Sequence, residues 1–252
     1  MPALTRRSLV AASLPLSLAM TGSQPRVGLA APVAPQAPLP DFSGVRLVPG
    51  DWRAPWTPSD WTEPKLSGYR WSPQEATVVG GALELRLRDG RTAQVQAGDR
   101  AFSRDALFEV DATLPRMRPG LIVAPLWLYS RTTRDEADFE VVGTRGLTVT
   151  VYARGRSVWS RLLIPGDLSG ARLRLGLRYQ AGRRLSFLVD GRERAALSAD
   201  DAEAFPRAPL KPLMELWPTR AVEWAGAWRA PSPGEALTLT IHGYRATPGG
   251  GS

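Results

Sequence analysis

The stretch of sequence that decides the fold runs from residue 135 to residue 143 and reads Asp135-Glu136-Ala137-Asp138-Phe139-Glu140-Val141-Val142-Gly143. Acidic and apolar residues alternate through it with a period of two. On a β-strand, residues two apart share a face. The three acids at 136, 138 and 140 therefore point to one side. The apolar residues between them point to the other side, which we expect to be the core.

Three carboxylates on one face of a strand repel one another, and a sequence selected only for stability would avoid that arrangement. An enzyme can use such a group of carboxylates for catalysis, because retaining glycosidases need two carboxyl groups about 5–5.5 Å apart. A solvated edge strand paired with arginine is the competing interpretation. Arg131, Arg134 and Arg145 are close enough in sequence to supply such partners.

The sequence on both sides of this strand predicts further short strands. Residues 82–88 alternate apolar and polar, and Asp89-Gly90 then gives a hairpin signal before the chain resumes at 91–96. Other strands are expected at 105–114, 121–130, 147–153, 157–164, 172–179, 184–190, 212–217 and 235–245, and Asp190-Gly191 marks another tight turn. Residues 50–75, with several tryptophans among prolines, are expected to be a loop-rich entry segment. Ser198–Ala204 is the best helical candidate, and it is short. The pattern predicts an all-β fold, an antiparallel β-sandwich or barrel.

The N-terminal part of the chain indicates export. Arg6-Arg7 precedes a short apolar run ending at Met20, a pattern typical of a twin-arginine signal and too short to span a bilayer stably. We assign residues 1–30 to the signal and 31–40 to a proline- and alanine-rich spacer, expected to be extended and unpacked. Residues 41–247 then form the β-sandwich domain, and 248–252 a flexible tail. The expected location is the periplasm or the extracellular space.

The acidic strand and its neighbours resemble glycoside hydrolase family 16. The family pattern is Glu-x-Asp-x-Glu, often with Asp before it and Gly a few residues after it. Residues 107–128, 185–191 and 213–226 agree with the family in order and spacing, and 237–244 fits its closing strand. The resemblance covers roughly residues 80–247. It implies a jelly roll of two curved sheets with a concave cleft.

The resemblance also implies roles for the three acids. Glu136 would be the nucleophile, Asp138 the assisting acid and Glu140 the acid/base. The motif lacks the extra bulge residue of laminarinase-like members and is closer to lichenases, xyloglucan-active enzymes and exopolysaccharide depolymerases. A retaining endo-glycosidase on a β-glucan or acidic exopolysaccharide is therefore expected, with transglycosylation as a further activity of the same site.

Four residues are candidates for substrate binding. Trp217 and Trp224 could stack on sugar faces, with core packing as the equal alternative, and Trp127 fits the core or cleft floor better than direct contact. Arg134 stands where lichenases often carry Trp, and it could pair with a uronate, pyruvyl, succinyl or sulfate group. Ala137, where the family has Ile or Leu, predicts a thinner core beneath the strand.

The amino-acid composition limits which metal sites, cofactors and partners can be expected. The chain has 252 residues, a net charge of +8, no cysteine and one histidine, His242. A catalytic zinc site is not expected, no cofactor is expected, and a structural calcium has no assignable ligands. The arginines are scattered, so nucleic acid is a poor partner. We expect a monomer that takes a polysaccharide substrate. The alternative function is a non-catalytic polysaccharide-binding β-sandwich of the periplasm.

Overall fold

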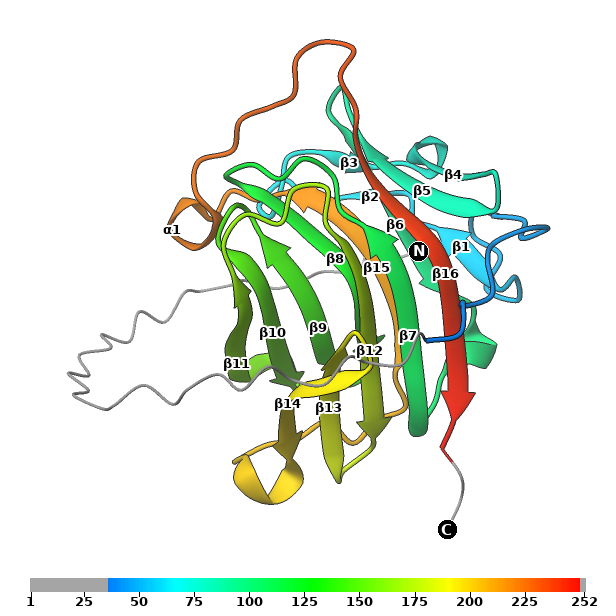
Figure 1. Ribbon diagram of the computed structural model, residues 1–252, viewed down its shortest axis with the longest axis vertical. Helices are drawn as coiled ribbons and strands as arrows, with labels where there is room; N and C mark the ends of the chain where they lie inside the picture. Colours follow the sequence, from blue (N-terminus) through cyan, green and yellow to red (C-terminus); the bar gives the residue numbers. More distant parts are fainter. Residues whose placement is uncertain (1–35, 250–252) are drawn as a thin grey trace.

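The computed structural model describes residues 36–249, which form two β-sheets packed face to face (Figure 1). The predicted β-sandwich is confirmed. Within these residues, the only helical segments are the single α-helix α1 (Val222–Ala225) and three 3₁₀ turns, η1 (Pro73–Glu75), η2 (Asp99–Ala101) and η3 (Ala199–Asp201). None of these described helices has the length and apolar character needed to cross a membrane.

One sheet has nine strands and carries the acidic stretch. Its strands, in spatial order, are β11 (Arg156–Pro165), β10 (Gly146–Ala153), β9 (Asp135–Val142), β8 (Leu121–Ser130), β15 (Lys211–Pro218), β6 (Arg91–Ala97), β3 (Arg70–Trp71) and β2 (Trp61–Thr62), with β1 (Trp56–Pro58) also paired to β6. All pairs are antiparallel except β3 with β6.

The second sheet has seven strands. In spatial order they are β14 (Arg192–Ser198), β13 (Arg184–Val189), β12 (Arg172–Gln180), β7 (Asp105–Thr113), β16 (Leu237–Pro248), β5 (Ala82–Leu87) and β4 (Ala76–Val79). Neighbours in space are often far apart in sequence, as with β7 beside β12 and β16. The order is therefore set by long-range pairing and not by successive hairpins alone.

The core lies between the sheets and is built from alternate residues of each strand. On β5, for example, Leu83, Leu85 and Leu87 are fully buried, whereas the residues between them are partly exposed. On β9 the core-facing residues are Ala137, Phe139 and Val141, as predicted. Burial of this kind is the main stabilising contribution to a sandwich.

Phe139 connects β9 to the opposite sheet. Its ring lies edge-on to Phe187 of β13, with 5.4 Å between the ring centroids. Trp159 of β11 also stacks on Phe187, with 5.7 Å between the ring centroids. These aromatic contacts fix which face of β9 points inward. On the same face, Ala137 lies between Leu128 and Val151 of the adjacent strands.

Two hairpins turn as their sequences predict. Asp89-Gly90 and Asp190-Gly191 adopt positive φ at both positions, between 46° and 74°. That is the backbone conformation of a type I′ turn, which suits the twist of the flanking strands. These two turns join β5 to β6 and β13 to β14.

Strand β8 contains an extra residue opposite the acidic strand. Its register with β9 shifts between Val123 and Leu126, and its register with β15 shifts over the same stretch. Pro125 lies inside this bulge. Because proline has no N–H to donate, a bulge is where an interior strand can accommodate it. The pairing of β9 with β10 runs without a shift from Glu136 to Val142.

Several elements differ from the sequence predictions. The region 50–75 adds β1, β2 and β3 to the nine-stranded sheet. Ser198–Ala204 is not a helix: it holds the end of β14 and the turn η3. The end of the spacer also packs, since Leu39 is buried and Arg174 donates to the Ala37 carbonyl at 2.6 Å. The predicted signal, residues 1–30, lies outside the described residues.

Replacing Phe139 by alanine should remove the contact that locks β9 against the second sheet. We expect the free energy of unfolding to fall by about 3–5 kcal/mol, as for other buried aromatic truncations. Urea denaturation measures it. Leu162→Ala, on a side chain that is 51% exposed, is the control and should change stability by less than about 0.5 kcal/mol. Equal effects would contradict the assigned orientation of β9.

Tyr244 gives an alkaline prediction. Burial raises the pKa of its phenol above the ordinary value of 10.0, so the fold holds the neutral form. The stability that depends on the neutral Tyr244 phenol should be fully present below pH 10 and should decline as the pH rises beyond it. Its hydroxyl is buried without a hydrogen-bond partner among residues 36–249.

Tyr244→Phe should therefore keep or increase stability at pH 7 and reduce the alkaline decline, by up to about 1.4 kcal/mol per pH unit. Thermal unfolding between pH 8 and 11 tests this. Tyr179→Phe is the contrasting variant, because the Tyr179 hydroxyl donates to the Ala208 carbonyl at 2.6 Å. That variant should be less stable already at pH 7. An unchanged alkaline decline in Tyr244→Phe would contradict the assignment.

Candidate active site

The three carboxylates lie on an interior strand, not on an edge. β9 is hydrogen-bonded to β8 on one side and to β10 on the other. Glu136, Asp138 and Glu140 are only 9, 1 and 4% exposed. The interpretation as a solvated edge strand is therefore wrong. Arg131, Arg134 and Arg145 lie in the turns at the two ends of β9 and are exposed.

These carboxylates point to the face of the nine-stranded sheet that is turned away from the core, called the outer face below. The strand register gives each one its neighbours. Glu136 lies between Tyr152 of β10 and Tyr129 of β8. Asp138 lies in the same way between Thr150 and Trp127. The outer face therefore surrounds the acids with aromatic rings and hydroxyl groups.

Glu140 is the acid beside the bulge of β8. Thr148 is its neighbour on β10, and the extra residue at 124–126 lies on the other side. Glu140 is four positions along the strand from Glu136, so their Cα atoms are roughly 13 Å apart at about 3.3 Å per residue. The two side chains have to converge across Asp138 to act on one bond. A bulge, which bends and twists the sheet locally, lies beside the place where that convergence is required.

A second apolar cluster covers the outer face. Trp127 and Trp217 are both buried in it, and Trp224 of α1 packs against it half-buried. All three predicted tryptophans thus lie on the same side of the sheet as the carboxylates. The expectation of a core or cleft-floor position for Trp127 agrees with its 2% exposure.

Two further tryptophans belong to this cluster and were not predicted. Trp61 of β2 and Trp71 of β3 stack with their rings almost parallel, 4.0 Å apart. The sequence placed them in a loop-rich segment. Only the pairing of β3 with β6 brings them to the outer face, and two-residue strands leave no periodic signal.

Glu215 is a fourth buried carboxylate on this face, and the sequence did not single it out. It is 1% exposed on β15. Its Oε2 accepts hydrogen bonds from the Gln94 amide at 2.7 Å and from the Trp71 indole at 3.2 Å. Its position two residues before Trp217 was the available signal, because that spacing puts both on one face.

Arg134 lies away from the carboxylates. It occupies the turn between β8 and β9 with a positive φ of 59°, and its side chain runs over Gly155 in the neighbouring turn. Its role in substrate binding remains a prediction.

The part of the chain that the structure describes holds no group of three or more His, Cys, Asp or Glu residues placed to bind a metal ion. His242 lies on β16 as a strand residue, with its Nε2 atom 2.8 Å from the Thr113 hydroxyl. Tyr244, on the same strand, packs against Trp56 with 5.0 Å between the ring centroids.

Comparison with known proteins finds matches in structure but not in sequence. No family model and no curated protein matches the chain. A lichenase (β-1,3-1,4-glucanase) from a mouse hindgut metagenome matches in structure with a TM-score of 0.65 at 21% identity, over 77% of this chain and 92% of that one. The β-glucanase of Bacillus licheniformis matches with a TM-score of 0.66 at 18% identity, over 76% and 91%.

The chain has the β-glucanase fold. An endo-β-1,3-glucanase from Pyrococcus furiosus extends the likeness to 83% of this chain and 93% of that one, with a TM-score of 0.63 and 17% identity. The jelly-roll sandwich implied by the sequence resemblance is thereby confirmed. Within this β-glucanase fold, β9 shows no register shift against β10, as the motif without an extra residue implied.

Neutralising Asp138 tests whether the acidic face is structural. Asp138→Asn removes one of three adjacent buried carboxyl groups, each of which disfavours ionisation of the next, so we expect the unfolding free energy to rise by about 0.5–2 kcal/mol. Chemical denaturation at pH 7 measures it.

Glu75→Gln is the matched control. Glu75 is also fully buried, but Arg88 and Arg91 bind it at 2.9 and 3.0 Å. Because both arginines are partly exposed, its loss should cost about 1–2 kcal/mol. A loss of stability in Asp138→Asn as large as that in Glu75→Gln would mean that the acidic face stabilises the fold.

Proposed function

We propose that this protein is a retaining endo-glycosidase that hydrolyses internal bonds of a β-glucan-type polysaccharide. One observation carries the proposal: three acidic side chains share the outer face of an interior strand, in a fold that this chain shares with β-glucanases. Burial of like charges costs stability, and catalysis is the reason for which such a cost is ordinarily kept.

In the proposed reaction Glu136 is the nucleophile and Glu140 is the acid/base. The Glu136 carboxylate attacks the anomeric carbon, while the Glu140 carboxylic acid gives its proton to the departing glycosidic oxygen. A glycosyl ester on Glu136 forms and the sugar on the leaving side departs. Water then attacks the same carbon as Glu140 takes back a proton, which restores both residues and retains the anomeric configuration.

Asp138 stands between the two and acts by hydrogen bonding rather than by attack. A carboxylic acid at this place can donate to the Glu136 carboxylate and hold it in position. Tyr129 and Tyr152 flank Glu136, and Trp127 flanks Asp138. The carboxyl groups are also nearly buried, and electrostatic interactions are stronger in such a setting.

The aromatic cluster supports a sugar polymer as the substrate. Pyranose rings have apolar faces that pack on aromatic rings. The partly exposed Trp61, which stacks on the fully buried Trp71, and the half-buried Trp224 belong to the cluster on the same face as the acids. Accessible rings on separate elements suit a chain of sugars better than a single monosaccharide, which favours internal cleavage.

Two further features belong to the same proposal. A sugar hydroxyl that replaces water in the second step would give transglycosylation. One protein with this fold, at a TM-score of 0.62, is the transglycosylase Crh5. Export to the periplasm or beyond, proposed from Arg6-Arg7 and the apolar run, would place the enzyme where polysaccharides are found.

Glu136→Gln and Glu140→Gln should each abolish glucan cleavage, with losses of at least about 10²–10⁴-fold, because each removes a reacting group. Release of reducing ends from mixed-linkage glucan, xyloglucan and acidic exopolysaccharides measures it. Circular dichroism checks the fold of both variants.

Thr148→Ser, which keeps the hydroxyl beside Glu140, is the control and should retain most activity. Wild-type-like cleavage in either glutamine variant would overturn the mechanism. Saturable polysaccharide binding by the wild type without any cleavage would favour the alternative, a non-catalytic binding protein.

A further inference from the structure

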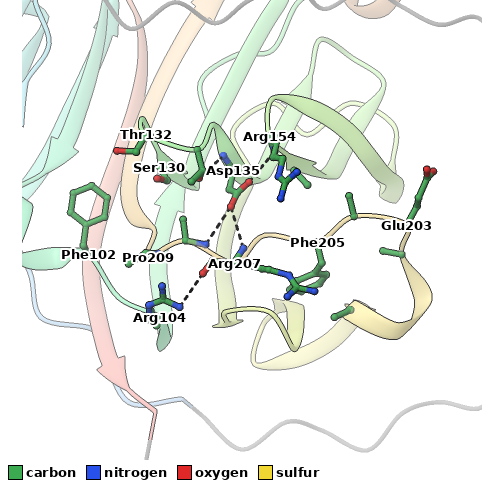
Figure 2. A pocket seen from close by; sticks show the side chains of 16 residues that line it. Phe102, Arg104, Ser130, Thr132, Asp135, Arg154, Glu203, Phe205, Arg207 and Pro209 are labelled. Carbon is green, nitrogen blue, oxygen red and sulfur yellow. Dashed lines mark hydrogen bonds between the residues drawn. The ribbon is translucent and has the colours of Figure 1, made fainter.

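A cavity of about 800 Å³ lies at the end of the sandwich where β9 begins, between the turn at 131–134 and the segment 199–209 (Figure 2). None of the three outer-face carboxylates lines it. Asp135 does, but it points to the opposite face of β9 from Glu136 because the two are adjacent on a strand. The cavity is therefore separate from the candidate active site.

The walls of this cavity are held rigidly. Asp135 is 4% exposed, and its two oxygens accept from the backbone N–H groups of Arg154 at 2.9 Å, Arg207 at 3.1 Å and Ala208 at 3.3 Å. Tyr179 anchors the Ala208 carbonyl from below. One buried carboxylate thus joins the turn between β10 and β11 to the segment that leads into β15, and the cavity is preformed.

Three arginines line the cavity without acidic partners. Arg104, Arg154 and Arg207 are exposed, and none has a carboxylate within 4.0 Å among residues 36–249. Other exposed arginines of the fold do have one, such as Arg172 with Asp111 and Arg184 with Glu193. Arg104 donates to the Arg207 carbonyl at 3.1 Å. The Asp135 carboxylate is occupied by three backbone donors, and Glu203 lies at the outer margin in Figure 2.

The rest of the lining suits a sugar. Phe102 is 38% exposed, an unusual position for a phenyl ring, and Phe205 and Pro209 add apolar surface. Ser130, Thr132 and Thr133 bring hydroxyl groups to the opposite wall. A small free anion would leave most of the volume unfilled, whereas pockets for drug-sized or oligosaccharide-sized ligands span roughly 300–1,000 Å³.

We infer that this cavity is a second carbohydrate site that binds an anionic oligosaccharide segment, with the guanidinium groups of Arg154 and Arg207 on its carboxylate or sulfate groups. Guanidinium groups bind such oxyanions in a planar, two-pronged geometry. The site would hold an acidic polysaccharide at the end of the sandwich and does not depend on cleavage at Glu136 and Glu140.

Calorimetric titration of the full chain carrying Glu136→Gln, which cannot turn over substrate under the proposed mechanism, tests the inference with three probes. These are tetragalacturonate, neutral cellotetraose and sodium sulfate. We expect tetragalacturonate to bind and to shift the backbone amide signals of Arg154 and Arg207 in NMR spectra. Glucan cleavage by the wild type is measured separately, so failure of the glycosidase proposal and failure of this one are distinguishable.

The deciding variant combines Arg154→Asn, chosen because asparagine tolerates the positive φ of 53° at this turn, with Arg207→Ala. It should weaken tetragalacturonate binding at least about tenfold, since it removes charge-assisted hydrogen bonds. The matched control combines Arg145→Ala with Arg229→Ala, two exposed arginines outside the cavity lining. It should leave binding within about twofold.

An equal loss in the control would reduce the binding to general charge attraction and overturn the inference. Sulfate that binds as tightly as tetragalacturonate would mean that the site takes an adventitious ion only, and would also overturn the inference. The same holds if cellotetraose binds as well as tetragalacturonate. If the double variant unfolds, Arg207→Gln alone replaces it with the same titration and NMR readouts, because this change keeps the backbone N–H that binds Asp135. It should also weaken tetragalacturonate binding. Unshifted amide signals in the presence of tetragalacturonate would also overturn the inference.

Discussion

The structure depends on the placement of β9 as an interior strand with one face locked into the core. Phe139 packs edge-on against Phe187 of the opposite sheet, and both edges of β9 are hydrogen-bonded to neighbouring strands. A strand held on three sides cannot rotate or slip by one residue without exposing its core face. The acids at 136, 138 and 140 are therefore obliged to stay together on the outer face, whatever their mutual repulsion.

Buried carboxylates occur in two different settings in this molecule. Some bind neighbouring segments together, and others lie beside one another on the outer face. Glu75 is fully buried, and two arginines compensate its charge. Asp135 is buried and receives three backbone N–H groups. Both serve to hold segments together. On the outer face, by contrast, carboxylates are gathered beside one another among aromatic rings, an arrangement that suits chemistry on a bound sugar more than stabilisation of the fold.

Local signals predicted much of the fold. Period-two alternation located β5 and β9, and the Asp-Gly pairs at 89–90 and 190–191 located two type I′ hairpins. β14 was missed, since its arginine-rich start carries no clear alternation. The strands β1, β2 and β3 were missed because three-residue or two-residue strands have no period to detect. β1 and β3 pair with β6, a partner up to roughly forty residues away in sequence, and β2 pairs with β3.

For the site, the sequence by itself determined that three acids share one face of a strand, because side-chain direction in a strand follows from residue parity alone. It also determined that Trp217 lies on the same face of its strand as Glu215. Only the tertiary structure decided that Glu215, Trp61 and Trp71 join that outer face, and that Arg134 lies over Gly155 in a turn. These are matters of strand order and turn packing, and long-range contacts between separate segments set them.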